Sequence, residues 1–227
     1  ARQFIAEGAR VAITGSSAKS VEAARAELGD KVLVIQADAG NVAGQAAVAE
    51  TVKNAFGTLD ILFVNAGIAE FGPVEGWSEA AFDKSFAINV KGPYFLIQAL
   101  LPIFSKKASI VLNTSINAHI GMPNSSVYSL TKGALLTLAK TLSGELIGRG
   151  IRVNAISPGP ISTPLYDKLG MSEADSKAMA SHIQSQIPAG RFGDVSEVAK
   201  TIVFFASDEA AYIVGSELII DGGMSNL

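Results

Sequence analysis

The sequence predicts a doubly wound α/β fold, in which helices cover both faces of a mostly parallel sheet. Short apolar runs alternate along the chain with longer segments of helical periodicity. The runs ILFV (61–64) and SIVLN (109–113) lack polar residues at alternate interior positions, which is typical of strands buried on both faces. The helical segments between such runs are long enough to carry the chain back across a parallel sheet.

The elements follow in order from the N-terminus. Residues 1–7 end a helix that Gly8 closes. Apolar and β-branched runs predict strands at 10–14, 32–36, 61–65, 109–113, 152–157 and 217–220. Helical segments are expected near 18–28, 42–56, 78–104, 126–148 and 194–206, and a short helix near 172–184. That short helix lies in an irregular stretch, 158–187, whose length is typical of a functional loop.

Composition disfavours several classes of function. The 227 residues include no cysteine, which excludes a disulfide framework and favours a reducing compartment, the cytoplasm. His119 and His182 lie far apart, so no metal site is expected. The net charge of −3 and scattered basic residues disfavour nucleic acid, and no apolar run reaches the roughly 20 residues of a membrane span. Charged residues make up 17%, which favours an oligomer.

Small, polar and glycine residues follow the predicted strands at the edge where parallel sheets bind ligands. They are Thr14-Gly15-Ser16, Asp38, Asn65-Ala66-Gly67, Thr114-Ser115 and Ser157-Pro158-Gly159-Pro160. Glycine lets a ligand approach the backbone closely, and exposed N–H groups bind anionic oxygen. Turns use the same residue types for structural reasons alone, so a single turn of this kind does not indicate a binding site. Five of them at one edge of the sheet do favour one.

Tyr128 and Lys132 are four residues apart on a predicted helix and therefore lie on one face. A tyrosine has an ordinary pKa of about 10, and an adjacent ammonium is expected to lower it. Ser115 lies 13 residues upstream at a strand end, where its hydroxyl can meet the phenol across a substrate carbonyl. Each residue alone has an ordinary structural explanation, and the spacing of the three favours catalysis.

These residues resemble the short-chain dehydrogenase/reductase family, which has a Tyr-x-x-x-Lys pair with a serine upstream. The resemblance covers nearly the whole chain. It extends to Asp38, the Asn65-Ala66-Gly67 turn, Asn89 in Ile-Asn-Val-Lys-Gly, the Ser157-Pro158-Gly159 turn and the closing Ile220-Asp221-Gly222-Gly223. It implies one Rossmann domain over residues 1–227 and hydride transfer between NAD or NADP and a carbonyl or alcohol.

The resemblance also implies roles for single residues. Tyr128 would be the general acid or base, Ser115 would polarise the substrate oxygen, and Lys132 would lower the pKa of Tyr128 and bind the nicotinamide ribose. Asn89 would hold a relay water, unless it is a helix residue bonded to backbone. The cofactor would contact Gly15, Ser16, Ser17, Asp38, Asn65, Ala66, Gly67, Tyr128, Lys132, Pro158, Gly159, Ile161 and Thr163, although Thr163 could equally cap a helix.

One feature of the family is missing from the sequence. The glycine-rich turn that receives the pyrophosphate is absent, and Thr14-Gly15 falls at the family's second strand. About twenty residues, including a first strand, are therefore expected before Ala1. The alternative is a degenerate, non-catalytic member of the fold that senses nicotinamide or has a structural role.

Cofactor choice is expected to depend on the end of the second family strand. Gly15 occupies the position of the acid that binds the ribose in NAD-preferring relatives. Ser16, Ser17 and Lys19 follow and could bind a 2′-phosphate, so NADP is favoured over NAD. The alternative is an ordinary helix N-cap.

The substrate is expected to be a medium-sized, partly apolar carbonyl compound beneath a lid at 158–187. The apolar lid residues are Leu165, Tyr166, Leu169, Met171, Met179 and Ile183. Ile120 and Met122 are expected at the entrance, with His119 there or in a solvated loop. A homotetramer is expected, with contacts through the helices 78–104 and 126–148 and through the apolar stretch 211–220.

Overall fold

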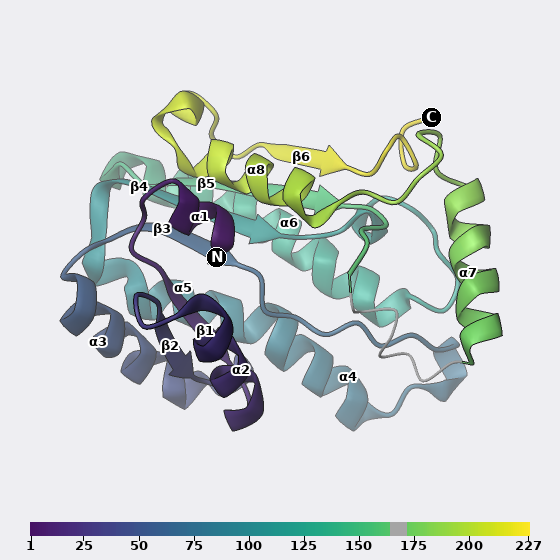
Figure 1. Cartoon of the computed structure of the whole chain (residues 1–227), viewed down its shortest axis with the longest axis horizontal. Coiled ribbons are helices and arrows are strands. Elements are labelled where there is room, and N and C mark those ends of the chain that lie inside the picture. Colours follow the sequence, from purple (N-terminus) through teal and green to yellow (C-terminus); the bar gives the residue numbers. More distant parts are fainter. Residues whose placement is uncertain (164–171) are drawn as a thin grey trace.

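The computed structural model of the chain describes residues 1–163 and 172–227, and it is an α/β structure with parallel strands (Figure 1). The strands are β1 (Ala12–Gly15), β2 (Leu33–Gln36), β3 (Leu59–Val64), β4 (Phe104–Asn113), β5 (Arg152–Pro158) and β6 (Glu217–Ile220). The helices are α1 (Arg2–Ala6), α2 (Ala18–Leu28), α3 (Gln45–Phe56), α4 (Glu79–Phe86), α5 (Gly92–Leu100), α6 (Ser126–Leu146), α7 (Glu173–Ser185) and α8 (Val195–Ala206). The predicted fold class and order of elements are confirmed.

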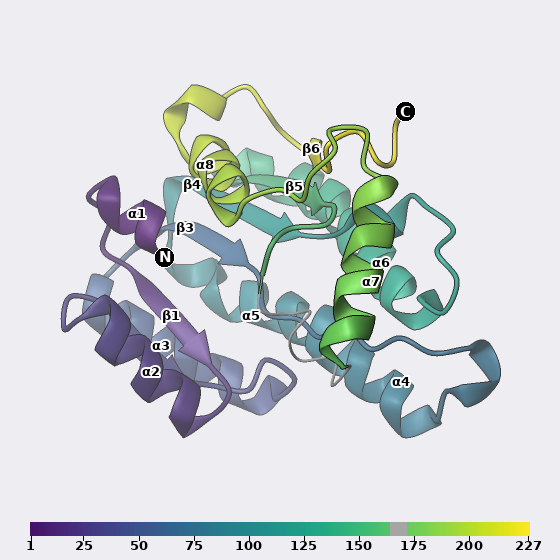
Figure 2. The same ribbon diagram turned by 45° about the vertical axis from the view of Figure 1, so that its right-hand side comes forward.

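The strands form two hydrogen-bonded sheets, whereas the sequence predicts one. In the described residues β1 pairs with β2, and β3-β4-β5-β6 form a separate sheet. Figure 2 shows β1 and β3 as neighbours across the break. Side chains rather than backbone hydrogen bonds connect the two sheets there, since Ala12 and Ile35 pack with Leu59 and Leu62. The strand expected before Ala1 stays a prediction.

The four-stranded sheet has its core on both faces of β4. Ile110 and Leu112 pack against α6, and Val111 packs against Ile202 and Phe205 of α8 on the opposite face. This confirms the prediction that the run at 109–113 is buried on both faces. Asp194 is the N-cap of helix α8, and its side chain accepts the N–H of Ser196, which satisfies a free donor of the first turn.

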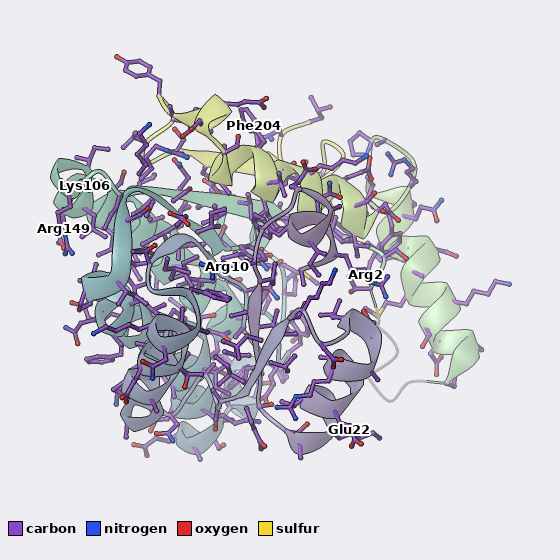
Figure 3. All side chains as sticks on the ribbon, turned by 60° about the vertical axis from the view of Figure 1, so that its left-hand side comes forward. Arg2, Arg10, Glu22, Lys106, Arg149 and Phe204 are labelled. Atoms are coloured by element: carbon purple, nitrogen blue, oxygen red, sulfur yellow. The ribbon has the colours of Figure 1, made fainter. Side chains whose placement is uncertain are left out.

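Two close contacts join the part of the chain around β1 and β2 to the rest. A Cβ at Gly92, the first residue of α5, would lie 1.8 Å from the carbonyl oxygen of Ala39, so only glycine fits there. Arg10 donates to the carbonyl of Phe56 at 3.1 Å and lies over its ring, joining the approach to β1 with the end of α3 (Figure 3). The first contact places the loop that carries Asp38 directly beside α5.

The helical stretch Glu79–Ile103 is, by length and composition, apolar enough to cross a membrane, with a mean hydropathy of 1.2. Core helices of globular proteins pass the same test. Here Leu100 and Ile103 pack against Ala49 and Val52 of α3, and Ile97 packs in the core beside β4. The packing explains the apolar composition of this stretch.

The predicted lid segment contains both described and undescribed residues. Ile161 bridges to Gly193 beside the sheet, and α7 forms where a short helix is expected. The predicted lid residues Leu165, Tyr166, Leu169 and Met171 lie outside the described residues. Of the other two, Met179 and Ile183 are half-buried on α7.

Candidate active site

A cavity of about 380 Å³ opens at the carboxyl ends of β3, β4 and β5. Ligands of open parallel sheets bind at this edge. The predicted site residues that line the cavity are Asn65, Ser115, Tyr128, Pro158, Gly159, Ile161 and Thr163. A smaller cavity of about 60 Å³ toward β1 and β2 is lined by Asn65 and Ala66. Gly15, Ser16, Ser17, Asp38, Gly67, Asn89 and Lys132 line neither cavity.

Tyr128 and Lys132 stand on one face of the first turns of α6, as their spacing predicts. Lys132 is 5% exposed, and its Nζ donates to the carbonyl of Asn113 at 2.8 Å. The same Nζ lies 5.6 Å from the centroid of the Tyr128 ring. The buried ammonium is therefore held between the end of β4 and the phenol.

Ser115 follows β4 and is the N-cap of η5 (Ile116–Ala118), a 3₁₀ helix of one turn. Its side chain accepts the N–H of Asn117 at 3.2 Å, which caps the turn. The Ser115 hydroxyl also donates to Oδ1 of Asn117 at 3.2 Å, and it lies near enough to the Tyr128 phenol to affect its pKa. Both residues line the cavity.

Burial raises the pKa of Tyr128, and the nearby Ser115 hydroxyl offsets this only in part. The net direction is therefore the opposite of the predicted lowering, because burial outweighs the effect of nearby charge. The ammonium lies near the ring, and burial penalises the phenolate more strongly. Burial also lowers the pKa of Lys132 to about 8. At neutral pH the phenol accordingly retains its proton, as a proton donor must.

Asn89 is buried in a π-helical turn, η3 (Ala87–Lys91), between α4 and α5. Its Oδ1 accepts the N–H of Ile68 and its Nδ2 donates to the carbonyl of Ile68, both at 2.8 Å. Nδ2 also donates to Thr131 at 3.0 Å, and the Thr131 hydroxyl donates to the carbonyl of Tyr128. The two bonds to the backbone of Ile68 fit the alternative in which Asn89 is a helix residue bonded to backbone. Together with the bond to Thr131, they connect the loop after β3 to α6. π-turns are frequent at functional sites.

The residues after β1 and β2 are mostly exposed. Ser17 is the N-cap of α2 and accepts the N–H of Ser20 at 3.1 Å, which bears out the N-cap alternative for this residue. Asp38 accepts the N–H of Gly40 at 2.9 Å. Lys19 makes no ion pair with any residue that the structure describes. Its charge is available to a ligand.

The cavity residues fit a nicotinamide cofactor. Asn113 lines the cavity, and its buried Oδ1 has no hydrogen-bond partner among the described residues. A Cβ at Gly67 would lie 3.3 Å from Oδ1 of Asn89 and 3.7 Å from Nζ of Lys132, so the missing side chain keeps the approach to both groups open. The two cavities share Phe63 and Asn65 in their walls, and together they extend from the end of β5 toward β2.

Sequence reasoning missed three residues near the site. Asn113 donates to Oδ1 of Asn65 at 2.9 Å, across the ends of β4 and β3. Phe71 packs edge-on against Tyr128, with ring centroids 5.7 Å apart, and remains 45% exposed. Glu217 on β6 pairs with His119, which is exposed in its loop, as one of the two expectations for it has it, but has this carboxylate as a partner. No pattern of residue spacing in the local sequence predicts these contacts.

The fold and the site define a class of nicotinamide-dependent oxidoreductases, and comparison with known proteins agrees. A sequence model of a family described as enoyl-(acyl carrier protein) reductase matches residues 1–225. An uncharacterised oxidoreductase of Thermotoga maritima is 37% identical, with 97% of this chain and 89% of the relative covered. A 2-keto-3-deoxy-L-fuconate dehydrogenase of Xanthomonas campestris is 36% identical, with 96% and 73% covered.

Solved structures agree. A short-chain dehydrogenase/reductase from Brucella melitensis superposes with a TM-score of 0.90 at 31% identity, covering 97% of this chain and 88% of that one. One from Serratia marcescens superposes with a TM-score of 0.89 at 31% identity, covering 99% and 91%. The chain belongs to the short-chain dehydrogenase/reductase family. It is an oxidoreductase that transfers hydride between NAD(P) and a small-molecule substrate.

Proposed function

We propose that the protein reduces a carbonyl to an alcohol, and catalyses the reverse, with Tyr128 as general acid and base. The placement of Ser115 and Tyr128 near each other in the wall of one cavity carries this proposal. A substrate oxygen placed between them would accept a hydrogen bond from Ser115 and a proton from Tyr128. The bound cofactor would supply or accept the hydride.

Lys132 and Asn89 would support this proton transfer. When Tyr128 gives up its proton, the nearby Lys132 ammonium stabilises the phenolate by charge. Asn89 fixes α6 through Thr131, and a water held near it would connect Lys132 to solvent. Asn65, Ala66, Gly67, Pro158, Gly159, Ile161 and Thr163 would hold the nicotinamide half of the cofactor, and Asp38 would hold its adenine.

We propose NADP as the preferred cofactor. Gly15 has no carboxylate to repel a 2′-phosphate, and the Lys19 side chain is exposed in the first turn of α2. Ser16 is exposed beside them and can donate to the phosphate. Ser17 contributes less, because its hydroxyl caps α2.

The proposed substrate is a partly apolar ketone, aldehyde or alcohol. Phe71 forms an apolar wall against Tyr128, and Met122 is 43% exposed on the loop before α6. A lid at 158–187, within one domain spanning residues 1–227, would complete the site. Turnover of a carbonyl panel graded in apolar size, with NADPH and NADH, tests the proposal. Cofactor binding without turnover of any member would instead support a nicotinamide sensor.

We further propose a cytoplasmic homotetramer. Large apolar side chains are exposed on two sets of elements. Tyr94, Leu130 and Ile147 lie on α5, α6 and the turn after α6, and Phe204 (Figure 3), Tyr212, Val214 and Leu218 lie on or between α8 and β6. Two isologous contacts produce a tetramer of this kind. Light scattering should give a tetramer for the wild type and dimers for Leu130→Asp and Tyr212→Asp; a monomeric wild type would overturn the proposal.

A further inference from the structure

One carboxylate on β6 connects both ends of the segment that carries Ser115. Oε1 of Glu217 accepts a hydrogen bond from Nε2 of His119 at 2.6 Å and another from the hydroxyl of Ser157. The side chain of Glu217 is only 14% exposed and that of His119 is 30% exposed. This pair lies outside the group of residues assigned to proton transfer.

The inner connection runs from Glu217 through Ser157 to the residue before Ser115. The hydroxyl of Ser157 donates to Glu217 and contacts the hydroxyl of Thr114, which itself donates to the carbonyl of Ile156 at 2.7 Å. Both hydroxyls are buried, and Thr114 lines the cavity. Buried polar networks of this kind are stabilising only when each member has its partner.

The outer connection runs from Glu217 through His119 to the other side of Ser115. The N–H of His119 donates to the carbonyl of Ile116 at 2.8 Å and so ends the turn η5. Ser115 caps the same turn at its start. A single hydrogen-bonded turn therefore separates the catalytic hydroxyl from the imidazole held by Glu217.

We propose that Glu217 is a positioning residue for the reaction, because it fixes through Thr114 and His119 the segment from which Ser115 meets Tyr128. The inference rests on the proposed function of Ser115. Glu217 is suited to the role because it belongs to a strand that is hydrogen-bonded to β5, whereas residues 114–125 lie mostly in turns. Without the carboxylate, both connections lose their common acceptor, and the segment around Ser115 keeps only the bonds of Thr114 to Ile156 and the bonds within η5.

A double-mutant cycle of His119→Ala and Glu217→Ala tests the role. Each single variant should lower kcat about fivefold to tenfold, and the double variant should be no slower than the slower single one. The dissociation constant for NADPH, measured by fluorescence, should stay within about twofold in all variants, since neither residue lines a cavity. Glu50→Ala, an exposed carboxylate on α3, is the matched control and should change neither quantity.

Glu217→Gln separates positioning from charge and avoids the risk that Glu217→Ala fails to fold. The amide oxygen can still accept from Ser157 and His119, so this variant should recover most of the lost kcat. The imidazole resonances of His119 should shift in Glu217→Ala, whereas those of His182, the other histidine of the sequence, should not. This readout is independent of activity.

Two results would overturn the proposal: multiplicative effects of His119→Ala and Glu217→Ala on kcat, or no effect of either. Tyr128→Phe, measured in parallel, distinguishes this failure from failure of the proposed function. If Tyr128→Phe keeps wild-type turnover, the proposed chemistry is wrong. If it loses turnover while the cycle shows no coupling, only the role of Glu217 is wrong.

Discussion

The two sheets differ in how they hold their functional residues. Around the four-stranded sheet, Asn89, Ser115 and Lys132 are each at most 7% exposed and hydrogen-bonded. After β1, by contrast, Ser16 and Lys19 are exposed. Burial shifts pKa values and fixes geometry, whereas exposure leaves only screened charge for recognition. We therefore propose that residues around the larger sheet carry the chemistry and residues after the smaller one choose the cofactor.

The largest effect is expected for Tyr128→Phe. The variant keeps the ring and its contact with Phe71 but has no transferable proton. Turnover should fall by about 10²–10⁴-fold, the range usual for general acid–base groups. Cofactor affinity should change little. Steady-state kinetics and a fluorescence titration measure the two quantities, and wild-type turnover would remove Tyr128 from the mechanism.

The second prediction concerns the pH dependence of stability through Lys132. Its pKa of about 8 in the folded protein lies below its ordinary value of 10.5. Between these values the unfolded chain binds more protons, so stability should rise with pH from about 8 to 10.5. Lys132→Met removes this dependence.

Denaturant unfolding of the two proteins checks the point. The wild type should gain about 2–3 kcal/mol relative to Lys132→Met between pH 7 and pH 10. Subtracting the free energy of unfolding of one protein from that of the other cancels the contributions of groups that titrate in both. A difference that does not vary with pH would show that Lys132 is not held in a desolvated site.

Gly15→Asp probes the smaller sheet and should change cofactor preference by about tenfold, through repulsion of the 2′-phosphate. A Cβ at Gly15 would lie 3.0 Å from Oγ of Ser20, so the substitution also crowds the start of α2. Gly15→Ala is the steric control. The ratio of kcat/KM for NADPH and NADH should fall in Gly15→Asp and stay unchanged in Gly15→Ala. An equal fall in both variants would trace the effect to crowding.

Lys19→Ala should have the smallest effect. An exposed charge pair contributes little, so NADPH should weaken about threefold to fivefold while NADH is unaffected. Lys31→Ala, an exposed lysine just before β2, serves as the matched control. If both variants weaken NADPH equally, Lys19 contributes only to the general field of the surface.

Most elements could be predicted from local sequence, and the differences come from contacts between distant segments. Strand β6 forms at the predicted residues 217–220. Strand β4 begins at Phe104, five residues before the predicted start, because Phe104 pairs with Leu59 across a register shift. Because the exposed residues Lys106 and Lys107 interrupt the apolar run, the sequence predicts a strand only after them.

The site shows the same limit. Helical spacing placed Tyr128 and Lys132 on one face, but spacing carries no information on burial, and the predicted direction of the Tyr128 pKa was therefore wrong. The partner of His119 is 98 residues away in the sequence. Such a contact follows from the packing of β6 beside β5 and not from any local pattern.

The proposed division of work between the two sheets can be tested with one paired measurement. Tyr128→Phe and Gly15→Asp are each assayed for kcat with their better cofactor and for the ratio of NADPH to NADH dissociation constants. Tyr128→Phe should lose kcat at an unchanged ratio, and Gly15→Asp should change the ratio at a nearly unchanged kcat. If both quantities change by similar factors in either variant, the two sheets do not have separate roles.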